Sequence, residues 1–248
     1  MTRTVVVSGG GTGIGYAVAE RFAADGDQVI LVGRREDVLT EAARKIGDQA
    51  SHVVADLTEI EGAERVAKHA ADHHGTVDVI VANAGGNIGI QAPEQVPEGL
   101  AGVSWLWTEN LRLNVITAVH LVEGLKPHIA DDGRILLFSS IAAYRGSGSG
   151  SYAASKAALH PYAIDLSTEL GPRGITANVI APGYIQDTEF FGAGISEQRR
   201  AWNIDLTHSK RPGTPADIAA LAHWLAAPEG GNVTAQIIQS NGGALAGR

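Results

Sequence analysis

The sequence predicts an α/β fold in which a doubly wound, Rossmann-type parallel sheet of about seven strands carries helices on both faces. Short β-branched runs alternate along the chain with longer segments of helical spacing. Because the apolar residues in these runs are continuous rather than alternating, we expect strands that are covered on both faces. The first run leads directly into a glycine-rich turn and then a helical pattern. With 248 residues, 44% of them apolar, the chain is expected to form one domain over residues 1–248.

The individual elements follow from composition and spacing. The β-branched runs predict strands at 4–7, 28–32, 52–54, 77–81, 134–138, 176–180 and 236–238. Segments rich in Ala, Leu and Glu predict helices at 14–25, 36–47, 59–74, 104–130, 152–171 and 214–227. Pro161 lies inside one of these helices, where it should remove a backbone hydrogen bond and bend the axis.

Three segments interrupt the alternation of strand and helix: 85–102, 146–151 and 183–213. Each of them follows a predicted strand, and ligands in open α/β sheets bind outside the carboxyl ends of the strands. We therefore expect all three to border one crevice.

Composition argues against several classes of function. The chain has no cysteine, which excludes disulfides, thiolate metal sites and a cysteine nucleophile. Its formal charge of −8 disfavours binding to nucleic acid, and its apolar stretches are too short and interrupted for a membrane span or secretion signal. A reducing cytoplasm is the natural expectation for its location.

The glycine-rich turn is the first candidate binding element. It comprises Ser8, Gly9, Gly10, Gly11, Thr12, Gly13, Ile14 and Gly15. Glycines let the backbone turn sharply and approach a pyrophosphate, whose charge then meets free amide groups at the start of the helix. No Lys-Ser or Lys-Thr pair follows the last glycine, so the pattern is not that of a nucleoside-triphosphate loop. The alternative is a tight turn without a ligand.

The end of the second strand indicates which dinucleotide would bind. Gly33 offers no carboxylate to a ribose hydroxyl at this position, whereas Arg34 supplies a guanidinium suited to a 2′-phosphate. This favours NADP(H) over NAD(H). The alternative is that Arg34 and Arg35 are solvated loop cations.

The spacing of Tyr152 and Lys156 is typical of an acid–base pair on a helix. At i and i+4 both side chains lie on one helix face, where a nearby ammonium group would lower the pKa of the phenol. Upstream, Ser139 and Ser140 close a strand, so a hydroxyl there could bind a substrate oxygen. An ordinary amphipathic helix face is the alternative interpretation of the pair.

Together these residues resemble the short-chain dehydrogenase/reductase family in its form of about 250 residues, over nearly the whole chain. The resemblance implies a catalytic set of Asn114, Ser140, Tyr152 and Lys156, in which Asn114 would hold a water linking Lys156 to solvent. The usual spacing to the tyrosine selects Ser139, whereas alignment through Gly146 favours Ser140, which we take as the catalytic serine. The expected cofactor-binding residues are Ser8, Gly9, Gly11, Thr12, Gly13, Ile14, Gly15, Arg34, Arg35, Asp56, Leu57, Asn83, Ala84, Gly85, Tyr152, Lys156, Pro182, Gly183, Ile185 and Thr188, with no metal.

The resemblance implies an oxidoreductase that moves hydride between NADP(H) and a carbonyl or secondary alcohol carbon, with reduction of a ketone the leading expectation. The alternatives are an NAD-linked alcohol dehydrogenase and a dinucleotide-binding sensor or scaffold without chemistry. Family members commonly self-associate, so a homotetramer or homodimer is expected. Substrate loops are expected at about 86–103 and 184–210.

The remaining candidates have simpler explanations. A histidine pair at helical spacing could bind zinc, but no third ligand is evident, so His69, His73 and His74 are expected to be a solvated face. Core or interface packing is expected for Trp105, Trp107 and Trp224. Pocket lining and packing within the loop are equally open for Tyr184, Phe190, Phe191 and Trp202. Surface solvation, with contact to an anionic substrate as the alternative, is expected for Arg145, Arg199 and Arg200.

Overall fold

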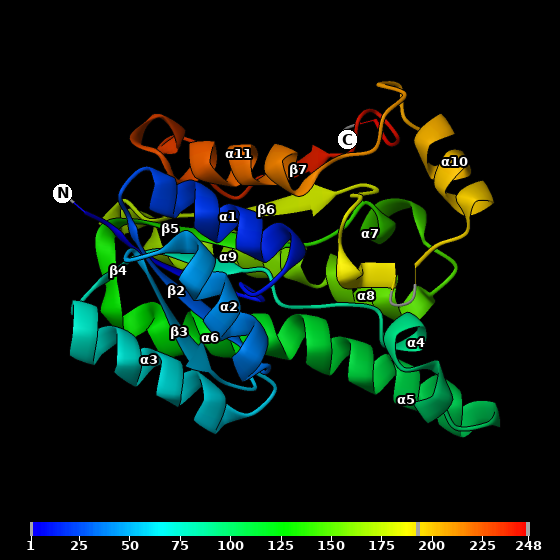
Figure 1. Ribbon diagram of the computed structural model, residues 1–248, viewed down its shortest axis with the longest axis horizontal. Coiled ribbons are helices and arrows are strands. Elements are labelled where there is room, and N and C mark those ends of the chain that lie inside the picture. The colour runs from blue at the N-terminus through cyan, green and yellow to red at the C-terminus, as the bar shows by residue number, and fades with distance from the viewer. Residues whose placement is uncertain (1, 192–193, 247–248) are drawn as a thin grey trace.

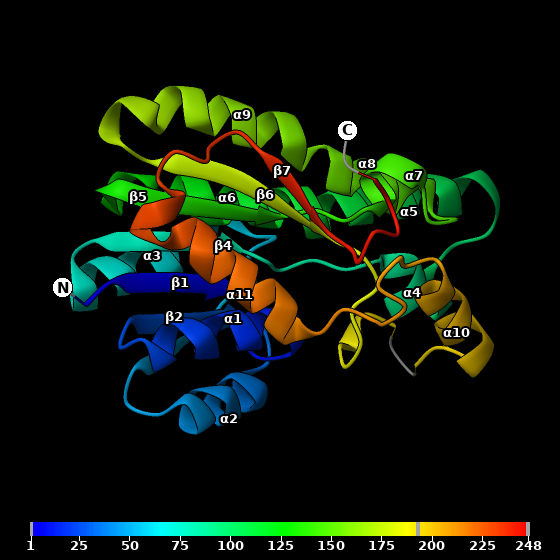
Figure 2. The same ribbon diagram turned by 90° about the horizontal axis from the view of Figure 1, so that it is seen from above.

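Seven parallel strands form the centre of the molecule (Figures 1 and 2). The computed structural model describes residues 2–191 and 194–246. In chain order the strands are β1 (Thr4–Ser8), β2 (Gln28–Gly33), β3 (Ala50–Val54), β4 (Val77–Ala82), β5 (Ile129–Phe138), β6 (Thr176–Pro182) and β7 (Ile237–Ser240). Their order in the sheet is β3-β2-β1-β4-β5-β6-β7, and every neighbouring pair is parallel. The predicted fold class and strand number are confirmed.

Helices cover both faces of this sheet (Figures 1 and 2). The first layer contains α1 (Gly13–Ala24), α2 (Glu36–Ile46) and α11 (Pro215–Ala226), and the second contains α3 (Ile60–His74), α6 (Thr117–Leu125) and α9 (Leu159–Leu170). Beyond the carboxyl ends of the strands lie α4 (Ile88–Gln91), α5 (Gly99–Leu111), α7 (Ala142–Arg145), α8 (Gly150–Ala157) and α10 (Glu197–Asp205).

Burial explains why the strand residues are apolar without alternation. Val5, Val6 and Val7 in the central strand are all 0% exposed. Val6 packs with the α3, α6 and α9 layer, whereas Val5 and Val7 pack with the α1, α2 and α11 layer. Successive side chains on a strand point to opposite faces, so each strand needs apolar residues at every position.

The strand order reverses direction between β1 and β4, which are neighbours although two strands separate them in the chain. The chain builds β1, β2 and β3 toward one edge and then returns to place β4 on the other side of β1. At such a point the connections leave the sheet in opposite directions and open a crevice at the carboxyl ends. The topology therefore positions the site beside the glycine-rich turn that follows β1.

Several sequence predictions need correction. The helix expected over 104–130 begins earlier and is divided into α5, a π-helical segment (Arg112–Ile116) and α6, and residues 129–130 belong to β5. This helix ends in a short 3-10 turn that contains Pro127. Proline has no N–H to donate to the next helical hydrogen bond, so the α-helix cannot continue regularly there. Within the stretch expected to be irregular, α10 begins where the Ser196 side chain accepts a hydrogen bond from the Arg199 amide.

The predicted effect of Pro161 is visible as a break in the helix. The expected helix over 152–171 is interrupted at Ala158, which separates α8 from α9. Pro161 has no N–H to donate to the carbonyl of Ala157, four residues earlier. The residues before this break include the predicted catalytic Tyr152 and Lys156, which lie on α8.

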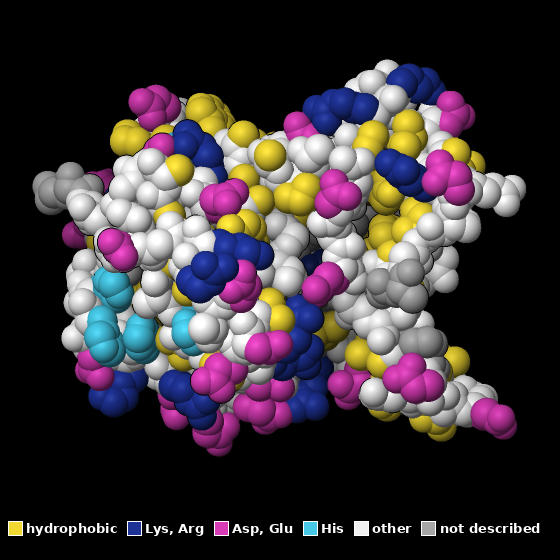
Figure 3. Space-filling model, viewed as in Figure 1, with side chains coloured by type: hydrophobic (Ala, Val, Ile, Leu, Met, Phe, Trp, Pro, Cys, Tyr) yellow, Lys and Arg dark blue, Asp and Glu magenta, His cyan; other side chains and the backbone are white. Residues whose placement is uncertain are grey.

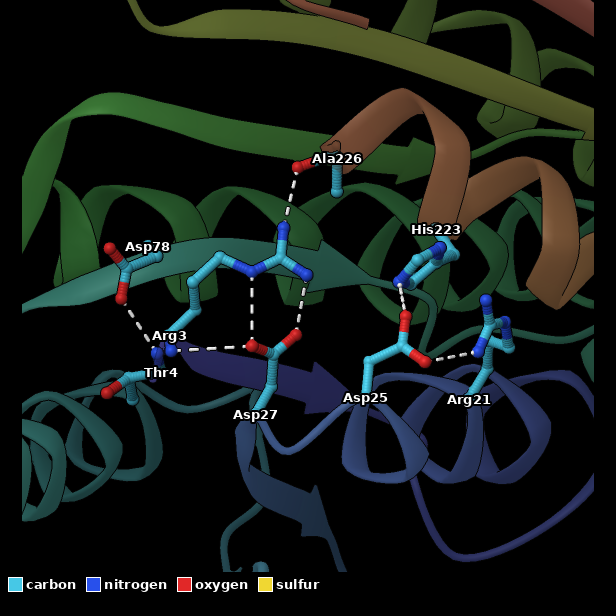
Figure 4. A network of polar contacts seen from close by, with 8 residues as sticks. All are labelled: Arg3, Thr4, Arg21, Asp25, Asp27, Asp78, His223 and Ala226. Atoms are coloured by element: carbon cyan, nitrogen blue, oxygen red, sulfur yellow. Dashed lines mark hydrogen bonds and ion pairs between the residues drawn. The ribbon is translucent and has the colours of Figure 1, made fainter. Parts of the chain in front are cut away.

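An ion-pair network lies at the end of the sheet opposite the crevice, where β1 and β2 begin (Figure 4). The Arg3 guanidinium donates two hydrogen bonds to the buried Asp27 carboxylate and a third to the carbonyl of Ala226. These contacts join β1 to the start of β2 and to the end of α11. Nearby, His223 on α11 lies 2.8 Å from Asp25, at the end of α1. The network joins the starts of β1 and β2 to the ends of α1 and α11, far from the predicted functional residues.

Candidate active site

A cavity of about 1420 Å³ opens at the carboxyl ends of β1, β2, β4, β5 and β6. Figure 3 shows this face hollowed between the body of the sheet and the lobe that carries α10. All three interrupting segments contribute to its wall, through Gly85 to Asn87, Gly146 to Gly148 and Gly183 to Ile185 among others. The expectation that these segments border one crevice is confirmed by the geometry.

Most of the predicted site residues line this cavity. They are Gly9, Gly11, Thr12, Gly13, Ile14, Arg34, Arg35, Asp56, Leu57, Asn83, Ala84, Gly85, Ser140, Tyr152, Lys156, Pro182, Gly183, Ile185 and Thr188. Three others, Ser8, Gly15 and Asn114, lie behind the wall and support it. Ser8 is 1% exposed, and its hydroxyl accepts a hydrogen bond from the amide of Ala84.

The backbone of the glycine-rich turn packs closely against the start of α1, as its sequence indicates. Gly9 and Gly13 adopt φ angles of 64° and 54°, a region that favours glycine. A Cβ atom on Gly15 would lie 2.1 Å from the carbonyl oxygen of Gly9, so only glycine lets α1 begin against the turn. The Asn83 amide donates to the carbonyl of Ser8, which fixes the turn to the segment after β4.

At the end of β2 the two arginines differ. Arg35 forms an ion pair with Glu189 at 2.7 Å, and the same carboxylate oxygen lies 3.3 Å from the Thr12 hydroxyl. Arg34 lines the cavity and has no ion pair or side-chain hydrogen bond within residues 2–191 and 194–246. Arg34 is therefore the cation available to a ligand at this end of the cavity, whereas Arg35 is already engaged.

Asp56 lies on the same side of the cavity. Burial tends to raise the pKa of Asp56, but hydrogen bonds from the backbone and hydroxyl of Thr58, together with the charges of Arg34 and Arg112, hold its pKa below the ordinary value. Its carboxylate is thus kept charged and oriented as a hydrogen-bond acceptor.

Tyr152 and Lys156 lie at the opposite end of the cavity and are only 6% and 5% exposed. Burial raises the pKa of Tyr152 to about 12, although a hydrogen bond with Ser140 acts in the other direction. Burial also lowers the pKa of Lys156 to about 8. The predicted lowering of the Tyr152 pKa by Lys156 is therefore wrong for this state of the protein, because removal from water disfavours both charged forms.

The two candidate serines have different partners. The Ser139 hydroxyl donates to the carbonyl of Lys156 and lies 2.9 Å from Nε2 of His160, so it faces the helix packing. The Ser140 hydroxyl accepts from the amide of Ala142 and forms the hydrogen bond with Tyr152. This geometry favours Ser140 as the hydroxyl presented to a substrate.

Asn114 lies in the π-helical segment and is completely buried. Its side-chain amide donates to the carbonyls of Gly86 and Asn110, and its oxygen accepts from the amide of Gly86. A Cβ atom on Gly85 would lie 2.5 Å from the Asn114 side-chain oxygen and 2.8 Å from Nζ of Lys156. Gly85 therefore lets these two polar groups approach the same space, and π-helical turns often occur at functional sites.

Sequence reasoning missed a second buried asparagine beside the site. Asn110 donates to the Ser151 hydroxyl at 3.0 Å, and Asn114 donates to the Ser155 hydroxyl at 3.1 Å. The two asparagines are four residues apart, and each serine directly precedes Tyr152 or Lys156. The helical spacing was visible in the sequence, but the pairing across 41 residues required the fold.

The aromatic residues after β6 are placed by the structure. The cavity wall includes Tyr184, Phe190, Phe191 and Trp202. Phe190 also packs against the Tyr152 ring, with ring centroids 5.5 Å apart. Trp107 and Trp224 are 44% and 47% exposed, so core packing is wrong for these two, and packing at an interface stays a prediction.

The histidines of α3 were the metal candidate. Figure 3 shows imidazole side chains gathered on this face, and the rings of His69 and His73 stack with centroids 4.2 Å apart. Among the described residues, no group of three or more possible ligands is arranged to hold a metal ion. Within the same residues, no helix combines the length and apolar character needed to cross a membrane.

The buried lysine gives a testable pH dependence. A lysine with a folded-state pKa of about 8 binds fewer protons than the unfolded chain between pH 8 and its ordinary pKa near 10.5. Its contribution to stability therefore rises with pH in this window, by about 2 kcal/mol between pH 8 and pH 10. We expect Lys156→Met to lose this rise.

Urea unfolding at pH 8, 9 and 10, followed by tryptophan fluorescence, measures the difference between the two proteins. Lys68→Met, on the exposed face of α3, controls for the removal of one positive charge. Parallel pH profiles for the wild type and Lys156→Met would contradict the shifted pKa.

The cavity residues fit the expected dinucleotide. The glycine turn offers a surface that a Cβ atom would obstruct, Arg34 offers an unengaged cation, and Asp56 offers an oriented acceptor at one end of the cavity. At the other end, Ser140, Tyr152 and Lys156 offer groups that can bind an oxygen atom and exchange a proton with it.

Comparisons with known proteins agree with this arrangement. The family model for enoyl-(acyl carrier protein) reductase matches residues 9–244. The 3-oxoacyl-[acyl-carrier-protein] reductase MabA of Mycobacterium avium is 30% identical over 246 residues, which cover 98% of this chain and 90% of MabA.

Two solved structures show the same fold. The short-chain dehydrogenase/reductase SDR:glucose/ribitol dehydrogenase from Brucella melitensis superposes with a TM-score of 0.89 at 28% identity, covering 99% of this chain and 97% of its own. A blue fluorescent protein from a metagenomic library, solved in complex with NADPH, superposes with a TM-score of 0.86 at 30% identity, covering 98% of each chain. Because these matches extend over nearly the whole length, the chain belongs to the short-chain dehydrogenase/reductase family.

Proposed function

We propose that this protein is an NADP(H)-dependent oxidoreductase that reduces a ketone to a secondary alcohol. The observation that carries the proposal is one cavity with Arg34 and the glycine turn at one end and Ser140, Tyr152 and Lys156 at the other. The family membership supports an enzyme acting on a carbonyl or alcohol group. The name of MabA, a 3-oxoacyl reductase, supports reduction as the direction.

The proposed cofactor contacts fall into two groups, one at each end of the cavity. The glycine turn would receive the pyrophosphate at the start of α1, Arg34 the 2′-phosphate, and Asp56 with Leu57 the adenine. Toward the reacting end, Asn83, Ala84, Gly85, Pro182, Gly183, Ile185 and Thr188 would hold the nicotinamide side. The NADPH bound to the blue fluorescent protein supports this choice of cofactor.

Bound NADPH would supply the hydride to the carbonyl carbon. Ser140 hydrogen-bonds the carbonyl oxygen, and Tyr152 donates its phenolic proton as negative charge develops on that oxygen. A pKa of about 12 keeps Tyr152 protonated at neutral pH, as a proton donor requires. Lys156, which donates a hydrogen bond to the carbonyl of Phe138, supplies positive charge beside the phenolate that forms.

We also propose a single working domain over residues 1–248, with substrate loops at about 86–103 and 184–210, in the cytoplasm. A homotetramer or homodimer is part of this proposal. It is supported by exposed apolar side chains on α5 and on the α9 and α11 surfaces, namely Leu100, Trp107, Leu111, Ile164 and Trp224.

The proton-donor role can be tested by removing one oxygen atom. Tyr152→Phe should lower kcat for ketone reduction by about two to four orders of magnitude, because the general acid is lost. The dissociation constant for NADPH should change little, which fluorescence titration measures.

The serine assignment is tested with the same assay. Ser140→Ala should lower kcat. Ser139→Ala should act mainly on thermal stability, because the Ser139 hydroxyl faces His160.

A Tyr152→Phe enzyme with nearly wild-type turnover would contradict the mechanism.

The cofactor preference is tested by Arg34→Ala. Loss of the guanidinium should weaken NADPH binding about tenfold or more, since hydrogen bonds to charged groups contribute roughly 1.5–3 kcal/mol, and should leave NADH binding nearly unchanged. The measurement is the dissociation constant for each cofactor. Arg44→Ala, which removes an α2 arginine that pairs with Glu41, controls for the loss of one positive charge. Tighter binding of NADH by the wild type would favour the NAD-linked alcohol dehydrogenase instead.

A further inference from the structure

Two arginines in the cavity wall have no role in the proposed chemistry. Nearly all Lys and Arg side chains of this acidic protein have an acidic partner or donate to a backbone carbonyl. Within residues 2–191 and 194–246, the side chains that do neither are Arg34, Arg145 and Arg199, and all three line the cavity. Arg34 belongs to the cofactor end. The other two, the arginine pair Arg145 and Arg199, are exposed, as expected for surface arginines, but they border the cavity without an acidic partner among these residues.

The arginine pair lies at the substrate end. Arg145 closes α7, five residues after Ser140, and Arg199 lies on α10. The cavity carboxylates do not neutralise the pair, because Asp56 is held by Thr58 and Glu189 is bound to Arg35. The two guanidinium groups border the same cavity, and the pKa of Arg145 is lowered by burial first and by the charge of Arg199 second.

Aromatic rings line the cavity beside Arg199 and beside Tyr152. The Arg199 guanidinium lies over the Trp202 ring at 4.6 Å, and Trp202 lines the cavity. Phe190 lies against the Tyr152 ring. A ligand in this cavity could therefore contact aromatic rings beside Tyr152 and beside Arg199.

We propose that Arg145 and Arg199 bind an oxyanion of the substrate, a carboxylate or phosphate group joined to the ketone by an apolar segment. This inference rests on the proposed function of the same cavity. Guanidinium groups bind carboxylate and phosphate through paired, charge-assisted hydrogen bonds, and a bound anion would relieve their mutual repulsion. The substrate class is accordingly an anionic ketone.

Matched ligands test the charge requirement without turnover. Calorimetry with NADP+ present, so that no reduction occurs, compares para-acetylbenzoate, para-acetylphenyl phosphate and neutral para-acetylbenzamide, together with homologues that carry a longer alkyl spacer. We expect wild-type protein to bind at least one anionic ligand about tenfold or more tightly than its amide. The anion that binds more tightly shows whether the site prefers a carboxylate or a phosphate group.

Variants assign that preference to the pair. Arg145→Gln/Arg199→Gln should bind the anion and the amide equally, whereas Arg200→Gln, a neighbour on α10 that pairs with Glu197, should keep the wild-type preference. Equal binding of acid and amide by the wild type, or a preference that persists in the double variant, would overturn the inference.

A parallel NADPH oxidation assay separates the two proposals. Reduction of the amide without any preference for an anion would retain the oxidoreductase and overturn the oxyanion site. A preference in binding that depends on the arginine pair, without reduction of any ketone in the set, would support the oxyanion site and count against the proposed reaction.

Discussion

Burial of the Lys156 ammonium group, which has no carboxylate partner among the residues that the structure describes, is the constraint on which the candidate site depends. Its Nζ donates to the carbonyl of Phe138, at the end of β5, and burial lowers its pKa to about 8. Such a group disfavours folding, so the surrounding structure must hold it in place. Asn114 and Gly85 lie beside it, and the Ser139 hydroxyl donates a hydrogen bond to the Lys156 backbone carbonyl.

The fold supplies that support from two directions. Parallel strands bury their apolar residues between two helix layers, and the Arg3–Asp27 network joins the starts of β1 and β2, away from the cleft. At the cleft edge, buried asparagines replace apolar packing and pair with serines on α8. Stability is thus concentrated in the sheet, and the polar groups that a reaction requires are placed where strands end and loops begin.

Much of this arrangement could be predicted because it depends on local pattern. Continuous apolar runs predicted the strands, and the turn from Ser8 to Gly15 predicted the cofactor end because glycine has a distinct conformational role. The Tyr152 pKa could not be predicted from its spacing to Lys156, since burial raises this pKa and outweighs the hydrogen bond with Ser140, which lowers it. Glu189, which contacts Arg35 from 154 residues away, and the Asn110–Ser151 pair required the tertiary structure. The short helix α10 was missed because its flanking glycines and prolines resemble a loop.

The central claim is that one cleft brings the cofactor site and the Tyr152–Lys156 pair together. Carbon NMR of tyrosine labelled at Cζ, with Tyr152→Phe to assign the resonance, measures the Tyr152 pKa directly. The account predicts a pKa near 12 in the free protein, and a lower value with NADP+ bound because the oxidised nicotinamide adds positive charge nearby. A Tyr152 pKa near 10 in the free protein that NADP+ leaves unchanged would contradict it.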